Sequence, residues 1–582
     1  MNGWLSPIKA ALGDSVFKAR QDINRKYMQS LDCRRLMANY YAEAGLTSNR
    51  EQENICLHYG GWEEPEQQVR GSFTGHYLSA AAMLWAAEGD QTFRSRADFL
   101  VNELECCGRE HLDGWCMSIP QLYLDWIMRD KWVWAPQYMV HKTLMGLVDA
   151  YKYAGNAKAL QAAERVCAWL YERVKDYTRE QQDQMLKWET GGLMEVFADL
   201  YGITGDEKYR VLLEKYCRYE LFERLLAGED ALSHAHANTT IPEAHGCARA
   251  YEVTGDEKFR RMAEAFWRNG VEERDALATG AQNSHELWLG DVSFCNTVRN
   301  QEFCTVYNLI RLADYLFRWS GDAKYAEYIE RALYNGALTQ QHRETGANAY
   351  FLPLCPGAKK EWGDLYNAMY CCYGTTVQAQ SAYGFLVFYS REREITLAQY
   401  IPARAAVDGI ELSLEEQSQL QVTASPYLRT YTLRLSQQAA SRFVLKLRQP
   451  TWVQRFQVSI DGEPVDAAQA QSFLAIDRLW GAQHTVTISF VWPLRTQRLS
   501  EQDERYAFLW GPVVLAGLTH REQALSGSPD DAGAVLRAVG TLDHHGFAHQ
   551  WLTTGQGVNL RFVPLYDVCD ETYTVYFPFA KA

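Results

Sequence analysis

The sequence predicts a multidomain α + β protein, in which an (α/α)6 helical toroid is followed by one or two β-sandwich domains. Long segments with helical periodicity fill residues 1 to about 385, and a glycine-containing turn recurs between them. From about residue 386 the chain changes to short alternating runs rich in Val, Thr, Phe and Tyr. A chain of 582 residues is also too long for one ordinary core. We therefore expect a helical barrel at 1–385, a β-sandwich at 386–500 and a second sandwich or β extension at 501–582.

The repeated turn predicts the toroid. The joins are separated by 66, 50, 50 and 66 residues and lie at Gly89-Asp90, Gly155-Asn156, Gly205-Asp206, Gly255-Asp256 and Gly321-Asp322. Glycine accepts the left-handed conformation that ends one helix, and Asp or Asn can cap the next. Five joins at this spacing predict about six helical hairpins, as a closed ring or, less favoured, an open solenoid. A closed ring would gather one end of its inner helices around a concave pocket.

The chain from about residue 386 onwards is predicted to form β-strands. Runs such as RTYTLRL, RFVLKLRQ and HTVTISFVW alternate apolar and polar residues. The segment SIDGEPV predicts a hairpin at Asp461-Gly462, because Asp-Gly favours the turn whose twist matches paired strands. No concentrated polar constellation falls in this part, so we expect the chemistry in the helical domain.

Charge and composition narrow the class of ligand. The net charge of −14 argues against nucleic-acid and anionic-membrane partners, which normally require a basic face. The first twenty residues lack a basic region followed by an apolar one, and no apolar run is long enough to span a bilayer. Fourteen cysteines without an export signal favour a reducing compartment, so we expect a cytoplasmic location. The sequence leaves a homodimer open.

The richest segment for chemistry runs from residue 283 to 374. Glu302 and Cys304 are two residues apart, and Cys371 and Cys372 are adjacent. Residues so spaced can share one metal ion only where the backbone is extended or a helix ends. Three thiolates and one carboxylate would complete a tetrahedral shell of the kind that favours zinc. The alternative is a set of buried structural cysteines, since Cys106-Cys107 shows that a pair alone is weak evidence.

A thiolate held in such a shell could act as a nucleophile, because a metal keeps a bound thiol deprotonated. A closed shell of four ligands is, however, more typical of a structural site. Glu286 lies beside His285 and close to Trp288, in a segment that looks like a loop between barrel helices. Such surroundings can raise the pKa of a carboxyl group and make it a general acid. A surface carboxylate is the alternative.

Further residues of the helical half could line a pocket for a sugar. Nine of the fourteen histidines fall between residues 58 and 342. Histidines at the mouths of barrel helices could donate hydrogen bonds to hydroxyl groups, although each could equally be structural. The candidates are His76, His141, His236, Glu330 and Tyr350.

Motifs along nearly the whole chain resemble one known family. They are YGGWEE at 59, GSFTGHYLS at 71, HKTLMGL at 141, HANTTIP at 236, ATGAQNSHE at 278, EFC at 302, ERALYN at 330, YCCYG at 370, and LRQPTW, VSIDGEPV and WGPVVLAG in the sandwich region. In their order and spacing they resemble the bacterial β-L-arabinofuranosidases of glycoside hydrolase family 127. The resemblance implies an (α/α)6 barrel with β-sandwich domains and a retaining, exo-acting mechanism. A zinc-bound cysteine then replaces the usual carboxylate nucleophile.

The resemblance also implies a role for each matching residue. Cys371 would be the nucleophile that forms a thioglycosyl intermediate, and Glu286 its acid/base partner. Glu302, Cys304 and Cys372 would complete the zinc shell with Cys371. The remaining candidates would line the sugar pocket, and they are His76, His141, His236, Glu330 and Tyr350. The expected substrate is a small oligosaccharide or glycoside that ends in a furanose-like sugar.

Three positions depart from the pattern of the family. Phe303 stands in place of the usual Thr between Glu and Cys, Met369 in place of a His two residues before the nucleophile, and Gln378 in place of a Glu. The loss of a hydrogen-bonding histidine beside the reactive sulfur makes a related furanoside or a deoxy sugar an alternative to arabinofuranose itself.

Three other functions remain open at this stage. A toroid epimerase or unsaturated-uronide hydrolase would keep the fold but would not need thiolates. A non-catalytic carbohydrate-binding or scaffold protein would use the zinc-thiolate cluster only to join two loops. A redox protein using Cys371 and Cys372 is the weakest alternative, because a disulfide between adjacent residues is strained.

Overall fold

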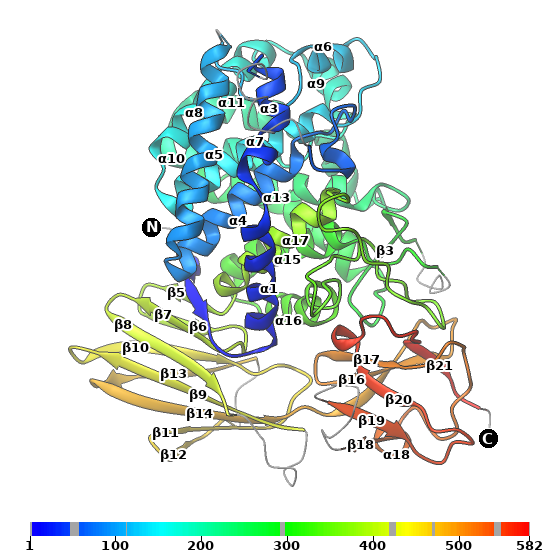
Figure 1. The fold of residues 1–582 in the computed structure, drawn as a ribbon. Coiled ribbons are helices and arrows are strands. Elements are labelled where there is room, and N and C mark those ends of the chain that lie inside the picture. Colours follow the sequence, from blue (N-terminus) through cyan, green and yellow to red (C-terminus); the bar gives the residue numbers. More distant parts are fainter. Residues whose placement is uncertain are drawn as a thin grey trace.

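The computed structural model describes residues 3–46, 58–111, 113–290, 297–417, 427–467, 472–539 and 549–580. A helical domain lies on one side of two β domains, which sit next to each other beneath it in the view of Figure 1. No helix in these ranges is long and apolar enough to cross a membrane.

In the described part of the chain, six helices form a closed inner ring. Each contacts the next, and the last contacts the first. They are α4 (Ser72–Glu88), α7 (Pro136–Ala154), α10 (Leu193–Thr204), α13 (Ala237–Thr254), α15 (Phe303–Ser320) and α17 (Cys371–Ser381). Each packs against one outer helix: in the same order α5 (Gln91–Glu110), α8 (Ala157–Val174), α11 (Glu207–Lys215), α14 (Glu257–Trp267), α16 (Ala323–Ala332) and α1 (Val16–Ser30). The predicted (α/α)6 toroid is confirmed.

The five predicted turns join inner to outer helices as expected. Each glycine is left-handed, with φ between 65° and 70°, and ends an inner helix. Each following Asp or Asn caps the outer helix by accepting a hydrogen bond from a backbone N–H of its first turn. The sixth outer helix, α1, precedes the ring in the chain and packs on α17, so five turns are enough for six pairs.

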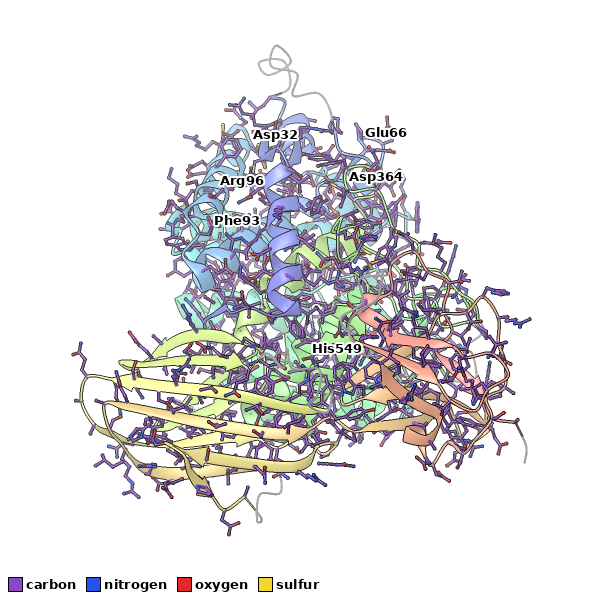
Figure 2. All side chains as sticks on the ribbon, turned by 60° about the horizontal axis from the view of Figure 1, so that its bottom comes forward. Asp32, Glu66, Phe93, Arg96, Asp364 and His549 are labelled. Atoms are coloured by element: carbon purple, nitrogen blue, oxygen red, sulfur yellow. The ribbon has the colours of Figure 1, made fainter. Side chains whose placement is uncertain are left out.

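Two contacts hold α1 and the first inner helices in place. Arg96 of α5 donates hydrogen bonds to the carbonyls of Met28 and Leu31 at the C-terminal end of α1 (Figure 2), where a cation is favoured. Helices α4 and α7 approach so closely that a Cβ on Gly75 would lie 2.0 Å from the carbonyl oxygen of Lys142. This approach brings the N-terminal halves of α4 and α7 side by side.

Short helices fill the connections of the helical domain. They are α2 (Cys33–Leu36), α3 (Ala38–Glu43), α6 (Leu122–Met128), α9 (Arg179–Leu186) and α12 (Tyr219–Leu226), with single turns at Gly61–Glu63, Arg268–Glu272 and Leu333–Ala337. A small hairpin, β3 (Asn283–Ser284) and β4 (Leu287–Trp288), lies at the mouth of the ring.

Two sheets form the middle domain. The first has the order β1 (Ser6–Ile8), β5 (Phe388–Arg391), β6 (Glu394–Leu397), β10 (Ser441–Arg448) and β13 (Phe473–Trp480). The second has the order β12 (Glu463–Val465), β11 (Gln454–Ile460), β14 (Gln483–Val491), β9 (Leu428–Gln437), β8 (Ile410–Glu416), β7 (Ala403–Val407) and β2 (Ala10–Leu12). The predicted hairpin at Asp461-Gly462 joins β11 to β12, with positive φ at both turn residues.

A third sheet follows towards the C-terminus. Its order is β15 (Leu494–Arg498), β16 (Arg505–Trp510), β17 (Val513–Gly517), β20 (Arg561–Pro564), β19 (Gln550–Thr553) and β18 (Leu536–Val539), and β21 (Tyr576–Pro578) also pairs with β16. The short helix α18 (Ala532–Val535) and a turn at Leu565–Asp567 lie between its strands.

The sheets differ from the predicted domain limits at two places. Residues 6–12, which the sequence assigned to the barrel, form edge strands of both sandwich sheets. Strand β15, which the sequence assigned to the middle domain, pairs with β16 and starts the third sheet. Both differences have the same cause, because strands of three to five residues carry too little periodicity to be recognised without their partners.

Candidate active site

The inner helices run in one direction, so their N-terminal ends meet at one mouth of the ring. Glu302 precedes α15 in extended conformation, with φ −64° and ψ 133°, and Cys304 is the second residue of that helix. Cys371 and Cys372 are the first two residues of α17. The four residues therefore meet at two neighbouring helix starts, which is the condition that their spacing imposed.

Their side chains form a compact, buried cluster. One ligand atom from each of the four residues lies within 4.8 Å of the others. The sulfur of Cys372 lies 3.3 Å from that of Cys304 and 3.9 Å from Oε1 of Glu302. The hydroxyl of Thr305 donates to Oε2 of Glu302 at 3.1 Å. We call Glu302, Cys304, Cys371 and Cys372 the sulfur cluster.

The charges of the sulfur cluster favour a bound cation. Burial raises the pKa of Glu302, Cys304 and Cys372 well above the ordinary values, and the crowding of acidic groups adds to this effect. Burial also acts on Cys371, but hydrogen bonds from Cys304, Cys372 and Tyr350 outweigh it and lower its pKa well below that of a free thiol. Four acidic groups buried together are costly unless a cation compensates them. The donor set therefore fits a metal ion.

Glu286 lies in a tight turn that presents its carboxylate to the mouth. His285 and Glu286 are the two central residues of the β3–β4 hairpin, with φ of 49° and 67°. Positive φ at both positions normally calls for Asn or Gly, so this backbone is strained, as is common at functional sites. Nε2 of His236, the residue before α13, lies 3.9 Å from Oε2 of Glu286. The hairpin thus aims one carboxylate at the first turns of the ring.

Tyr350 connects this carboxylate with the sulfur cluster. Its hydroxyl donates to Oε1 of Glu286 at 2.5 Å and lies 3.2 Å from Sγ of Cys371. Its carbonyl accepts a hydrogen bond from the backbone N–H of Phe303, so the departure at position 303 leaves this contact unchanged. Glu286, Tyr350 and Cys371 therefore form one continuous polar group.

His76 and His141 lie on adjacent inner helices, and burial lowers the pKa of both well below the ordinary value. Nδ1 of His76 lies 2.9 Å from Oε1 of Gln378, the residue that departs from the family pattern. Neither ring nitrogen of His141 has a hydrogen-bond partner among the described residues. Its ring packs on Gly191 and Gly192, where a Cβ would lie 2.8 and 2.7 Å away.

Glu330 does not join this group. Its carboxylate pairs with Arg448 of β10 at 2.6 Å and accepts a hydrogen bond from the indole of Trp452. Both carboxylate and guanidinium are buried between the barrel and the sandwich. The structure therefore places Glu330, which the sequence suggested for the sugar pocket, against residues of the middle domain.

Two charged residues that the sequence analysis did not select lie near the sulfur cluster. Burial lowers the pKa of Lys142 to about 8, against the attraction of Cys304 and Cys371. Burial and the negative charge of Cys371 raise the pKa of Glu189 to about 7. The sequence contains only weak signals that these two residues lie near the site. Lys142 directly follows His141, and Glu189 lies two residues before the glycines that pack on the His141 ring.

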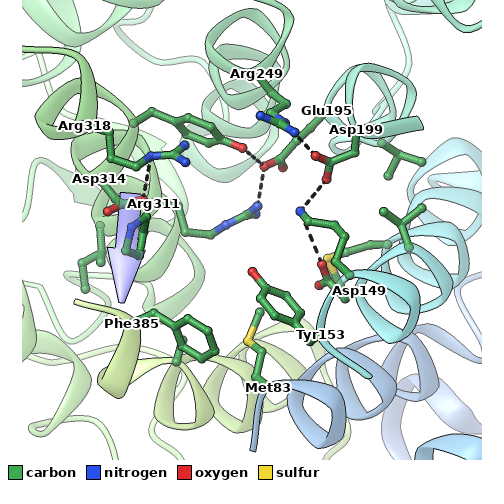
Figure 3. A pocket seen from close by; sticks show the side chains of 18 of the residues that line it. Met83, Asp149, Tyr153, Glu195, Asp199, Arg249, Arg311, Asp314, Arg318 and Phe385 are labelled. Carbon is green, nitrogen blue, oxygen red and sulfur yellow. Dashed lines mark hydrogen bonds and ion pairs between the residues drawn. The ribbon is translucent and has the colours of Figure 1, made fainter. Parts of the chain in front are cut away.

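The ring has a cavity at each end. A cleft of about 660 Å³ at the N-terminal ends of the inner helices includes Glu286 and Tyr350, and we call it the entry cleft. A second cavity of about 300 Å³ lies at their C-terminal halves (Figure 3). There Arg311 pairs with Glu195, and Lys152 and Arg249 pair with Asp199. The charged groups named here lie in ion pairs, whereas Glu286 and Tyr350 line the entry cleft at the opposite end.

The chain matches two sequence models of one family. The model of the β-L-arabinofuranosidase GH127 catalytic domain matches residues 10–384, and that of the GH127 middle domain matches residues 394–492. No curated protein matches the chain.

Solved structures support the same grouping at the level of the fold. A GH127 β-L-arabinofuranosidase from Geobacillus stearothermophilus T6 is 18% identical, with a TM-score of 0.77, over 98% of this chain and 100% of the other. The GH127 β-arabinofuranosidase BT3674 is also 18% identical, with a TM-score of 0.75, over 99% and 98%. The family models cover most of the chain, and the chain is therefore a glycoside hydrolase that belongs to family 127, the β-L-arabinofuranosidase family.

Proposed function

We propose that the protein is a retaining exo-glycosidase that releases a terminal furanose-like sugar, a β-L-arabinofuranoside or a close relative, with Cys371 as nucleophile. The observation that carries this proposal is the continuous contact from Cys371 through the Tyr350 hydroxyl to Glu286. This contact places the buried sulfur of Cys371, whose pKa is lowered, close to the half-buried carboxylate of Glu286. A nucleophile and an acid/base group are the two parts that a retaining glycosidase needs.

The sulfur cluster would hold one zinc ion through Glu302, Cys304, Cys371 and Cys372. Three sulfurs and one oxygen match the softness and coordination number that zinc prefers. When bound, zinc keeps the cysteine sulfurs deprotonated and neutralises part of their charge. The N-terminal ends of α15 and α17 add the positive ends of two helix dipoles.

In the first step, the sulfur of Cys371 attacks the anomeric carbon of the terminal sugar. A carbon–sulfur bond forms, the glycosidic bond breaks, and Glu286 gives its proton to the departing oxygen. In the second step, Glu286 takes a proton from water, whose oxygen attacks the same carbon and releases Cys371 as a thiolate. Two inversions at one carbon retain its configuration. The single proton of the Tyr350 hydroxyl would be donated to Glu286 or to the sulfur, whichever carries the charge.

The sugar would lie among His76, His141, His236 and Tyr350. The neutral ring of His141 has two unpartnered nitrogens, which fit one donor and one acceptor on a hydroxylated ligand. His236 lies beside Glu286 and is half-buried, so it can approach the sugar from the mouth. Gln378 places a neutral amide next to His76, where the family pattern has the carboxylate of a Glu. This change is compatible with arabinofuranose and with a related sugar.

The substrate would be a small oligosaccharide or glycoside, and the site of action the cytoplasm. No disulfide bond joins any of the twelve cysteines in the described ranges, as a reducing compartment favours.

A non-catalytic zinc-binding scaffold is the second candidate, and one observation favours it. The sulfur cluster offers four ligands, and closed shells of four ligands are usually structural. In such a protein the metal would support the fold, and no glycoside would be cleaved.

One experiment separates the two functions. Methyl and aryl furanosides and pyranosides of several sugars are offered to the parent enzyme and to Cys371→Ala, with the metal content of both measured. Cys106→Ala, which removes a half-buried thiol of α5 far along the chain, is the matched control. We expect release of one terminal sugar by the parent and the control and at least a thousandfold loss in Cys371→Ala. Full turnover by Cys371→Ala would refute the nucleophile, and no turnover by the parent would favour the scaffold.

A further inference from the structure

The entry cleft has a reactive end and an aromatic end. Glu286 and Tyr350 line the reactive end, and Trp62, Trp134 and Tyr370 line the aromatic end. Its volume of about 660 Å³ lies within the range that holds a small organic ligand. A terminal sugar placed over the sulfur cluster, as proposed above, would use only the reactive end and would leave the aromatic end for another group.

The aromatic residues form a continuous row that leads away from Tyr350 and Cys371. The centroids of Trp134 and Trp62 are 5.1 Å apart at 82°, and those of Trp62 and Tyr370 are 6.2 Å apart at 76°. Tyr370 is 6.5 Å from Tyr350, whose hydroxyl contacts Cys371. Because neighbouring rings meet almost at right angles, each pair makes a corner with one face and one edge. Such a corner can hold a puckered ring from two sides.

The rings are fixed before any ligand binds. The backbone N–H of Trp134 donates to the side chain of Gln68, and Trp62 also packs edge-on to Tyr138. Tyr370 is the residue before α17 and is 39% exposed. Trp62 and Trp134 are half-buried, so each keeps part of its ring open. Rigid aromatic side chains that pack on each other lose little entropy when a ligand covers them.

Polar side chains line part of the entry cleft, beside further apolar and aromatic residues such as Phe351 and Trp362. His285, Arg299, Lys359 and Glu361 are exposed residues of this lining and carry charges of both signs. A lining that combines aromatic rings with hydrogen-bonding groups suits a ligand that has an apolar C–H face and a rim of hydroxyls. A sugar ring has both, whereas a simple alkyl group has only the first.

We propose that the aromatic end of the entry cleft is a leaving-group subsite, in which the sugar next to the scissile bond stacks in the corner formed by Trp62 and Trp134. This inference rests on the proposed function, since Glu286 protonates the departing oxygen and the leaving group must lie on its side. Glu286 lines the entry cleft, so the departing sugar lies there. The preferred substrate is therefore a disaccharide or longer chain, not a furanoside of a small alcohol.

The test compares two substrates that share the same terminal sugar. The value of kcat/KM is measured for methyl β-L-arabinofuranoside and for a β-L-arabinofuranosyl-L-arabinose disaccharide. The variants are Trp62→Ala, Trp62→Phe and Trp134→Ala, with Tm measured for each. Trp132→Ala is the control, because Trp132 is 64% exposed, two residues from Trp134, and outside the cleft lining. The ratio is the kcat/KM for the disaccharide divided by the kcat/KM for the methyl furanoside. We expect this ratio to fall at least tenfold in Trp62→Ala and Trp134→Ala. In Trp62→Phe and Trp132→Ala it should fall less than threefold.

An equal loss on both substrates would overturn the subsite, because it would assign the tryptophans a structural role. If the parent cleaves neither substrate, the proposed function fails, and the entry cleft is then judged by binding alone. Quenching of tryptophan fluorescence by the disaccharide should be saturable in the parent and lost in Trp62→Ala. Identical quenching in both proteins would overturn the subsite without any reference to activity.

Discussion

The hydroxyl of Tyr350 lies 3.2 Å from the sulfur of Cys371. The same hydroxyl donates to Glu286 at 2.5 Å, so a single group contacts both partners of the proposed reaction. It helps to lower the pKa of Cys371, which burial alone would raise. Tyr350 therefore connects the proposed nucleophile to the proposed acid/base group.

Removal of this hydroxyl should slow the reaction without unfolding the protein. Tyr350→Phe keeps the ring that packs on Phe351 and deletes the donor to Glu286 and Cys371. A hydrogen bond to a charged group contributes about 1.5–3 kcal/mol, so kcat/KM should fall by roughly 10- to 100-fold. Steady-state kinetics measures the loss, and an unchanged kcat/KM would show that the contact has no role in catalysis.

Glu330→Gln should act on stability and not on substrate binding. Arg448 is fully buried, and its ion pair with Glu330 joins the barrel to the sandwich. Breaking a buried pair leaves one charge uncompensated and costs about 3–5 kcal/mol. We expect a clear drop in Tm by scanning fluorimetry, with less than a threefold change in KM. A raised KM at unchanged Tm would restore the sugar-pocket role that the sequence suggested.

The sequence was sufficient where local chemistry decides the structure. The Gly-Asp and Gly-Asn joins and the turn at Asp461-Gly462 depend on neighbouring residues only, and all adopt the predicted conformation. Strands β1 and β2 have three residues each and gain their partners from residues almost 400 positions away. No local pattern could have placed them in the sheets.

The site residues show the same difference between local patterns, which the sequence reveals, and long-range contacts, which it does not. Spacing predicted that Glu302 needs an extended or helix-end backbone, and it has one. The partner of Glu330 lies 118 residues away, so its ion pair was invisible in the sequence. Lys142 and Glu189 come near the sulfur cluster only through the closure of the ring. Tertiary packing, and not residue type, determines these contacts.

Glu243 should make stability depend on pH. Burial raises its pKa from 4.5 to about 7, although Arg218 opposes the shift. The folded state then binds its proton more tightly than the unfolded state, so this group's contribution is fully present below pH 4.5. As the pH rises from 4.5 to about 7, this contribution is lost, and the free energy of unfolding falls by about 3 kcal/mol. The Tm of Glu243→Gln relative to the parent should therefore rise from pH 5 to pH 7, by roughly 2–5 °C. A constant difference would contradict the raised pKa.

Metal removal should destabilise the helical domain. The sulfur cluster joins the starts of α15 and α17, so a bound cation would cross-link the two helix starts. We expect about one zinc per chain by elemental analysis and a fall in Tm after treatment with a strong chelator. In Cys304→Ala and Cys372→Ala the chelator should have little further effect. A parent protein without metal, whose Tm does not respond to the chelator, would contradict the metal site.

The most direct test of the account is alkylation of the proposed nucleophile. A bromoacetamide derivative of L-arabinofuranosylamine would carry its electrophile to the sugar pocket, and peptide mapping by mass spectrometry would locate the adduct. We expect one adduct per chain on Cys371, blocked by excess substrate and absent from Cys371→Ala, with activity lost in proportion to labelling. Labelling of another cysteine, or full activity after complete labelling of Cys371, would contradict the claim that this sulfur is the nucleophile.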